Sequence, residues 1–294
     1  MTPPARPPKT VCGLLDLVDD HDVFLIDQFG VLRDAGGPYP DAPETLRRLK
    51  AHGKQIIIVS NSGKRSAEND ARFAALGFAR GSWDLFLTSG EVAWQMMAED
   101  RTLLPEGKAR CLLISRDNDL SPLTGLALDP SADGASADLV LIAGSEGDRF
   151  DLDHYRRLLE PAARRNLPCW CTNPDTTMLT PQGLRFGAGR IAGLYQEMGG
   201  TVRFIGKPHA DIYRLALRSA GNPDPKRVIC LGDSIEHDIA GARQAGLRSA
   251  LVMSGILEGM SDAARENLCR SHSAWPDYIL PGFIWQDAQG GAIS

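Results

Sequence analysis

Val23-Phe24-Leu25-Ile26-Asp27-Gln28-Phe29-Gly30-Val31 is the stretch of sequence that decides the fold. Its first four residues are apolar, and such a short run is typical of a strand buried on both faces of a parallel sheet. Asp27 ends this run. In open α/β sheets, ligands bind at the carboxyl ends of the strands, so an acid at this point is placed for chemistry. An aspartate after a strand is also a common turn former, so further features are needed.

Three later apolar runs also end in side chains suited to phosphate or metal chemistry. The runs and their polar ends are Gln55–Val59 with Ser60, Val202–Ile205 with Lys207, and Val228–Leu231 with Asp233 and Asp238. Together with Asp27, these strand ends offer a carboxylate, a hydroxyl, an amine and a carboxylate pair. Because the carboxyl ends of parallel strands lie at the same edge of a sheet, we expect these side chains to meet.

The composition is that of a soluble globular protein, with 294 residues of which 43% are hydrophobic and 23% charged. The formal net charge of −5 argues against a basic, nucleic-acid-binding surface. No apolar stretch approaches the roughly 20 residues of a membrane span. The Pro-rich stretch Met1–Lys9 lacks the apolar core of a signal peptide. We therefore expect a cytoplasmic protein with reduced cysteines and with neither nucleic acid nor a membrane as partner.

The sequence between Ser60 and Lys207 is far too long for one connection, since loops in such folds have about 2–6 residues. It contains strand and helix patterns of its own, at Cys111–Ser115, Leu139–Ala143, Leu152–Asn166 and Cys169–Thr172. We therefore predict a smaller α/β domain at residues 84–185, inserted into a core formed by residues 1–83 and 186–294. The stretch 120–138, rich in Ser, Gly, Asp and Pro, is expected to be a mobile surface loop.

The core is expected to be α/β, with a doubly wound, Rossmann-like parallel sheet. Helical patterns separate its strands near residues 41–53, 67–76, 191–198, 209–220 and 235–245. Each of these helices would connect one parallel strand to the next by a right-handed crossover.

The polar strand ends suit phosphoryl transfer. A carboxylate such as Asp27 can attack phosphorus and form an aspartyl-phosphate, which water then cleaves. Asp27 and Asp233 can hold Mg²⁺, with Asp238 acting directly or through a water molecule. Lys207 can neutralise the phosphoryl oxygens, and Ser60 with nearby backbone amides can donate hydrogen bonds to them.

The order and spacing of these residues resemble the motifs of the haloacid dehalogenase-like (HAD) hydrolase superfamily over nearly the whole chain. The resemblance implies that Asp27, Ser60 and Lys207 are catalytic. It also implies that Ser60, Asn61 and Lys207 bind phosphate. The metal ligands that it implies are Asp27, Asp233, Asp238 and the backbone carbonyl of Phe29.

The inserted domain resembles the large cap of HAD subfamily IIA, which includes pyridoxal phosphatases and para-nitrophenyl phosphatases. By this resemblance the cap closes over the substrate, excludes water and sets specificity. Thr172–Thr177 is similar to the return from cap to core, where Asp175 either contacts the substrate or forms a turn. The resemblance also allows a homodimer formed through the caps.

Phe29 departs from the pattern of this superfamily. The phosphatases carry a second aspartate two residues after the nucleophile, which protonates the leaving group and later activates water. A phenyl ring transfers no protons, and a general acid-base group contributes about 10²–10⁴-fold. Asp34 and His237 are candidate replacements, although a solvated loop acid and a capping histidine are the simpler interpretations. The run Asp27–Leu32 also resembles an uncharacterised branch of subfamily IIA, so Phe29 can be a feature of that branch.

The leading hypothesis is a Mg²⁺-dependent phosphohydrolase that acts on a small phosphorylated metabolite and is weakened by Phe29. One alternative is a binding or regulatory protein that keeps the fold without efficient turnover. A second alternative is hydrolysis of a non-phosphate bond. Dehalogenases of the superfamily work without the second aspartate, but they do not need Mg²⁺, so the pair of Asp233 and Asp238 argues against this alternative.

Overall fold

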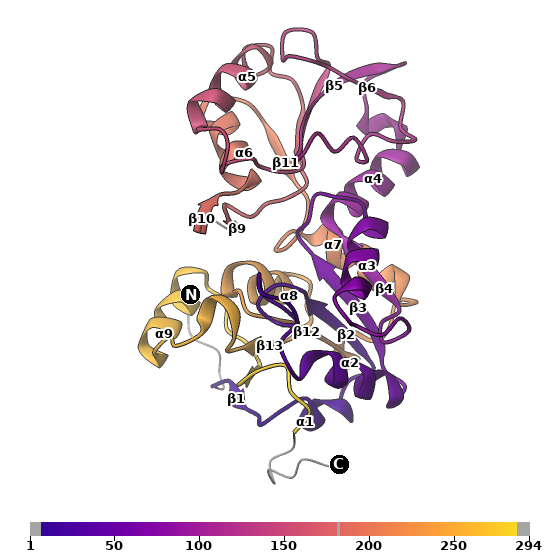
Figure 1. Cartoon of the computed structure of the whole chain (residues 1–294), viewed down its shortest axis with the longest axis vertical. Coiled ribbons are helices and arrows are strands. Elements are labelled where there is room, and N and C mark those ends of the chain that lie inside the picture. Colours follow the sequence, from indigo (N-terminus) through magenta and orange to yellow (C-terminus); the bar gives the residue numbers. More distant parts are fainter. Residues whose placement is uncertain (1–6, 181–182, 287–294) are drawn as a thin grey trace. The chain divides into compact units, whose positions relative to one another are not determined.

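The structure is a computed structural model that describes residues 7–180 and 183–286. The predicted lead-in Met1–Lys9 lies mostly outside the described residues. The chain divides into two compact units (Figure 1). The first unit comprises residues 1–60, 70–87 and 207–294, and the second comprises residues 61–69 and 88–206.

A seven-stranded sheet forms the centre of the first unit, in the order β1-β14-β13-β12-β2-β3-β4. Its strands are β1 (Lys9–Thr10), β2 (Val23–Asp27), β3 (Gln55–Ser60), β4 (Leu85–Thr88), β12 (Val228–Gly232), β13 (Arg248–Val252) and β14 (Tyr278–Leu280). Strand β2 pairs in parallel with both β3 and β12, and β12 pairs in parallel with β13. The chain moves from β2 outward through β3 and β4, then returns to β12 and moves the other way. This order confirms the predicted doubly wound core.

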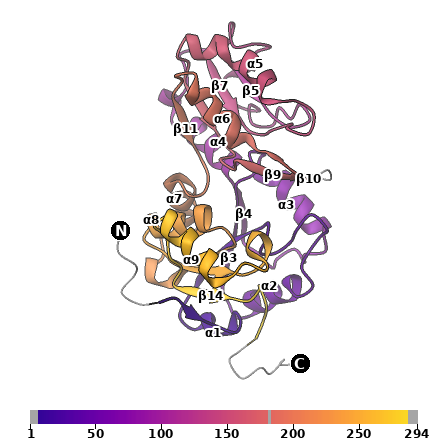
Figure 2. The same cartoon turned by 90° about the vertical axis from the view of Figure 1, so that its left-hand side faces the viewer.

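Helices cover both faces of this sheet. The helical segments are α1 (Leu15–Val18), α2 (Ala42–Ala51), α3 (Ser66–Ala75), α7 (Ala210–Ser219), η2 (Pro225–Arg227), η3 (Ile235–Ile239), α8 (Ala240–Gln244), η4 (Gly255–Leu257) and α9 (Asp262–Ser271). Buried side chains of α1, α2 and α3 pack with Phe24, Ile58 and Leu231 on one face. Segments η3, α8 and α9 contribute to a second cluster around Leu251. Figure 2 shows helices α8 and α9 in front of the sheet. Within the described residues, no helix combines the length and apolar character needed to cross a membrane.

Helix α2 shows how the sequence determines such a crossover element. Leu46 and Leu49 lie three positions apart on one face and are both fully buried. Glu44 stands in the first turn and Lys50 in the last, which suits the helix dipole. Gly53, just after the helix, adopts a positive φ of 70°, so the chain can turn sharply towards β3.

The second unit has its own five-stranded parallel sheet, in the order β11-β8-β7-β5-β6. Its other elements include a two-stranded antiparallel hairpin of β9 and β10. The elements are α4 (Ser89–Glu99), η1 (Arg101–Leu103), β5 (Ala109–Ile114), β6 (Leu128–Pro130), β7 (Leu139–Ile142), α5 (Leu152–Arg164), β8 (Cys169–Cys171), β9 (Thr177–Thr180), β10 (Gly183–Phe186), α6 (Ala188–Glu197) and β11 (Val202–Phe204). Helices α5 and α6 bury their apolar faces against this sheet.

One prediction about this part of the chain was wrong, and another needs a correction. Residues 186–206 were assigned to the core, but β11 pairs with β8 of the second sheet, and α6 packs in the second unit's core. A strand of only three residues fits the edge of either parallel sheet, so its pattern does not distinguish them. The stretch 120–138, predicted to be a mobile surface loop, consists mainly of turns and bends, but it also contains strand β6 and the buried side chains of Leu123 and Leu128.

Candidate active site

The candidate site lies where the strand order of the first sheet reverses. Asp27 ends β2, and Asp233 directly follows the last residue of the neighbouring strand β12. After β2 the chain crosses towards β3, and after β12 it crosses towards β13, so the two loops diverge. Ligands of doubly wound sheets bind at such a reversal.

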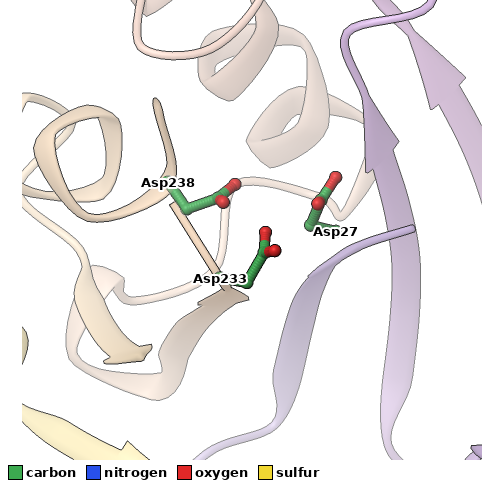
Figure 3. A group of neighbouring side chains, drawn as sticks. All are labelled: Asp27, Asp233 and Asp238. Atoms are coloured by element: carbon green, nitrogen blue, oxygen red, sulfur yellow. The ribbon is translucent and has the colours of Figure 1, made fainter. Parts of the chain in front are cut away.

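Three carboxylates gather at this point. One oxygen each of Asp27, Asp233 and Asp238 lies within 4.8 Å of the other two, and Figure 3 shows the three side chains as neighbours. Asp233 and Asp238 are buried, and the Asp27 side chain is 13% exposed. A Cβ atom at Gly232 would lie 2.0 Å from Cγ of Asp238, so the short turn after β12 requires a residue without a side chain.

Lys207 joins two of the carboxylates. Its Nζ donates to Oδ1 of Asp27 at 2.5 Å and to Oδ1 of Asp238 at 2.7 Å, and its side chain is 6% exposed. Three carboxylates, two of them buried and one partly buried, thus lie beside one ammonium group that contacts two of them. Uncompensated buried charge is costly, and oxygen ligands of this kind are those that Mg²⁺ and Ca²⁺ prefer. The residues therefore fit a divalent cation.

The charges of the site shift the pKa values of its groups. Burial raises the pKa of Asp27 well above its ordinary value, with a further rise from Asp238 and Asp233 and an opposing effect of Lys207. Burial, followed by the charge of Asp238, raises the pKa of Asp233 to about 7. Burial alone would lower the pKa of Lys207, but Asp238 and Asp27 outweigh it and raise that pKa. A bound cation would lower the pKa values of Asp27 and Asp233 again, because positive charge favours the ionised carboxylates.

In the absence of a divalent cation, we expect the carboxyl of Asp233 to make the protein less stable as the pH rises from about 4 to about 7. A raised carboxyl pKa means that the folded state binds the proton more tightly than the unfolded state does. The contribution of this carboxyl to the free energy of unfolding is therefore lost as its proton leaves. That contribution is on the order of a few kcal/mol. Thermal unfolding in EDTA at about pH 5 and about pH 8 measures it.

His21 acts in the opposite direction in this experiment, because burial lowers its pKa. The Asp233→Asn variant keeps His21 and removes the titrating carboxyl, so the difference between the two proteins gives the contribution of Asp233 together with its effect on the pKa of Asp27. A pH profile unchanged by this substitution would contradict the assignment.

Ser60 ends β3 and is buried, at 7% exposure. Val59 lies opposite Asp27 in the register of β2 and β3, so Ser60 stands one residue further along the neighbouring strand. This placement is compatible with the predicted phosphate-binding hydroxyl.

Asn61 and Asp175 belong to the second unit, where Nδ2 of Asn61 donates to Oδ1 of Asp175 at 2.8 Å. The backbone N–H of Asp175 donates to Oδ1 of Asn173 at 3.2 Å, so the side chain that forms the turn belongs to Asn173 and not, as anticipated, to Asp175. Contact of Asn61 or Asp175 with a substrate stays a prediction.

Phe29, two residues after Asp27, is 49% exposed, and the guanidinium of Arg33 lies 4.5 Å from its ring centroid. Asp34 does not resemble a replacement acid, because its Oδ1 accepts the backbone N–H groups of Gly36 at 2.7 Å and Gly37 at 3.2 Å. Asp34 thus stabilises the turn, as the simpler interpretation of the sequence proposed.

One segment that reaches the site was not expected from the sequence. The backbone N–H of Ile256 donates to Oδ2 of Asp233 at 2.9 Å, and Oγ of Ser254 donates to the carbonyl of Gly30 at 2.5 Å. A signal is present in the sequence, because these residues follow the apolar stretch of β13 and therefore stand at the same edge of the sheet.

Two family models match the chain. The model described as haloacid dehalogenase-like hydrolase matches residues 24–128, and the one described as HAD-hydrolase-like matches residues 204–284. These ranges contain Asp27, Ser60, Lys207, Asp233 and Asp238.

Individual proteins agree with these matches. Human chronophin is 26% identical over 91% of this chain and 93% of its own length. The structure of a haloacid dehalogenase-like hydrolase from Brucella suis has a TM-score of 0.79 and 27% identity, and it covers 93% of this chain and 99% of the other. The structure of a glycerol phosphate phosphatase from Mycobacterium tuberculosis in complex with calcium has a TM-score of 0.66 and 26% identity, with 82% and 68% covered. The chain belongs to the haloacid dehalogenase-like hydrolases.

Proposed function

We propose that this protein is a Mg²⁺-dependent phosphohydrolase that acts on a small phosphorylated metabolite through an aspartyl-phosphate at Asp27. The observation that carries the proposal is the contact of Lys207 with Asp27 beside the carboxylates of Asp233 and Asp238. One cation between a nucleophilic acid and an acidic pair suits the transfer of a negatively charged phosphoryl group. The similarity to a phosphatase that was solved with calcium supports the proposal.

In the first half of the reaction, a carboxylate oxygen of Asp27 attacks phosphorus while the bond from phosphorus to the leaving oxygen breaks. In the second half, water attacks the same phosphorus, the bond to Asp27 breaks, and inorganic phosphate is released. Lys207 stays protonated throughout and neutralises charge on the carboxylate and the phosphoryl oxygens. The hydroxyl of Ser60 donates a hydrogen bond to one of these oxygens.

The proposed ligands of the Mg²⁺ ion are Asp27, Asp233, Asp238 and the backbone carbonyl of Phe29. When bound, the ion supplies positive charge to the phosphoryl oxygens. This would explain why the protein keeps three poorly exposed acids beside one lysine, an arrangement that costs stability without a cation.

Phe29 determines which esters are hydrolysed well. Because the phenyl ring cannot protonate a departing oxygen, a leaving group must depart as an anion or take its proton from water. Aryl and acyl phosphates leave readily in this way, whereas alkyl phosphates do not. We therefore propose that the substrate has an activated leaving group.

Removal of metal tests the proposal. Phosphate release from para-nitrophenyl phosphate is expected to require Mg²⁺, to stop in excess EDTA and to recover when Mg²⁺ is added back. A panel of metabolite phosphates then ranks substrates, with acyl and enol phosphates expected above alkyl phosphates. Calorimetry that detects no Mg²⁺ binding, together with metal-independent turnover, would overturn the proposal.

Phe29 also favours a second candidate, a binding or regulatory protein that retains the site without efficient turnover. Such a protein would bind Mg²⁺ and phosphate by calorimetry but would hydrolyse no activated ester faster than its Asp27→Asn variant. The same metal and substrate panel therefore separates the two candidates.

A further inference from the structure

Ser254, Gly255 and Ile256, which we call the tether, follow β13 at the edge of the sheet where the three acids lie. Oγ of Ser254 donates to the backbone carbonyl of Gly30 at 2.5 Å. Gly30 lies three residues after Asp27 and directly after Phe29, whose carbonyl is a proposed metal ligand. The tether thus binds the backbone of the nucleophile loop.

The same tether binds Asp233. The backbone N–H of Ile256 donates to Oδ2 of Asp233 at 2.9 Å. A charge-assisted bond of this kind fixes one carboxylate oxygen and leaves the other available to a cation. One segment of three residues therefore contacts both the nucleophile loop and an acid of the cation site.

Two glycines let these parts approach each other. A Cβ atom at Gly30 would lie 1.9 Å from Oδ2 of Asp233, and one at Gly255 would lie 2.0 Å from the same oxygen. The Cβ atom at Gly255 would also lie 2.5 Å from Cα of Gly30. Both residues have positive φ values, 81° at Gly30 and 60° at Gly255. The carboxylate of Asp233 is thus held between two glycine backbones, where no side chain fits.

The tether is itself anchored on both sides. Before it, the backbone N–H of Met253 donates to the carbonyl of Leu280 at 2.9 Å. After it, Leu257 is buried among Ile235, Ile239 and Leu251. Because both of its ends are anchored, the tether keeps its place relative to the sheet. It therefore holds the carboxylate of Asp233 in position, whereas a free loop would move with that carboxylate.

We propose that the tether is a positioning element of the cation site, which holds the carboxylate of Asp233 at a set place relative to the nucleophile loop. Without such a bond, repulsion between Asp233 and the other two acids favours rotation of its side chain away from them. This inference rests on the proposed function, because it assigns the tether to the cation of that same site. Groups that hold metal ligands in place commonly affect metal affinity about 10–100-fold. Here Ile256 bonds the carboxylate of Asp233, and Ser254 bonds the backbone next to Phe29.

Mg²⁺ titrations by isothermal calorimetry test the tether with the full-length chain. Ser254→Ala is expected to raise the dissociation constant for Mg²⁺ about 10-fold or more, and Ser254→Thr, which keeps a hydroxyl, is expected to restore it. Gly255→Ala is expected to weaken binding further, because its Cβ meets Oδ2 of Asp233. Thermal unfolding in EDTA shows whether each variant is folded.

Ser261→Ala is the matched control. Ser261 lies a few residues further along, and its Oγ caps helix α9 by accepting the N–H of Ala264 at 3.3 Å. This variant is expected to unfold at a lower temperature with an unchanged dissociation constant for Mg²⁺. The control separates a loss of stability from a loss of cation binding.

The possible results distinguish the tether from the proposed function. Wild-type affinity in Ser254→Ala, or equal weakening by Ala and Thr, would overturn the role of the Ser254 hydroxyl while phosphate release by the wild type still supports the proposed function. A wild-type protein that binds no Mg²⁺ would overturn both. Weak binding in Ser254→Ala with recovery in Ser254→Thr would establish the tether.

Discussion

Asp27→Asn is expected to lower the rate of phosphate release by at least about 10⁴-fold, because an amide oxygen is a poor nucleophile toward phosphorus. The substitution preserves the size of the side chain and removes one charge from a cluster of three acids. The variant should therefore fold, and in EDTA it should be at least as stable as the wild type. The loss of turnover can then be attributed to chemistry and not to unfolding.

The measurement is the rate of phosphate release under saturating Mg²⁺. A second experiment tests for the covalent phosphoenzyme. Rapid mixing of the wild type with an activated ester, followed by acid quench, should trap phosphate on the protein, and Asp27→Asn should trap none. Asp34→Asn is a matched control, because Asp34 stands in the same loop but accepts the backbone N–H groups of Gly36 and Gly37. Turnover in Asp27→Asn equal to that of Asp34→Asn would refute the assignment of the nucleophile.

The second large effect is a gain of activity. Phe29→Asp is expected to raise the rate on alkyl phosphates by about 10²-fold, and by up to about 10⁴-fold if the carboxyl is well placed, because it supplies the missing proton donor. The gain on para-nitrophenyl phosphate should be much smaller, since that leaving group departs without a proton. The informative quantity is therefore the ratio of the rates on glycerol 3-phosphate and para-nitrophenyl phosphate.

The structure suggests that this substitution is tolerated. The Phe29 side chain is about half exposed, so the new carboxylate is not forced into the core, and the main loss is the contact with the Arg33 guanidinium. Such a contact contributes about 0.5–1 kcal/mol at an exposed site. Phe29→Asn is the control, because it has the shape of aspartate but donates no comparable proton. Equal rate ratios in the Asp and Asn variants would show that Phe29 does not limit the chemistry.

The core of the first unit was predictable because its signals are local. The apolar runs at Val23–Ile26, Gln55–Val59 and Val228–Leu231 become β2, β3 and β12, and the amphipathic pattern around Leu46 and Leu49 becomes α2. Right-handed crossovers leave few ways to arrange such units in one sheet. The carboxyl ends of the strands then necessarily share an edge, which brings Asp27 and Asp233 together.

The route of Lys207 to this edge was predicted incorrectly. The sequence indicated a core strand at Val202–Ile205 that delivers the lysine, whereas β11 pairs with β8 in the second sheet and Lys207 follows it into the first unit. The lysine nevertheless contacts Asp27 and Asp238. The role of Lys207 could be predicted from its residue type and its order in the chain. The sheet to which the preceding strand belongs could not, because strand pairing depends on contacts between residues far apart in the sequence.

The sequence by itself determined the doubly wound core, the order of the acidic and basic side chains, and the absence of a proton donor at position 29. These features depend on local periodicity and residue type, which are visible without coordinates. Only the tertiary structure decided which sheet receives β11, that Asn61 binds Asp175, and that Ser254 and Ile256 hold Gly30 and Asp233. These are contacts between residues distant in the chain, and the free energy of packing that selects them leaves no periodic pattern in the sequence.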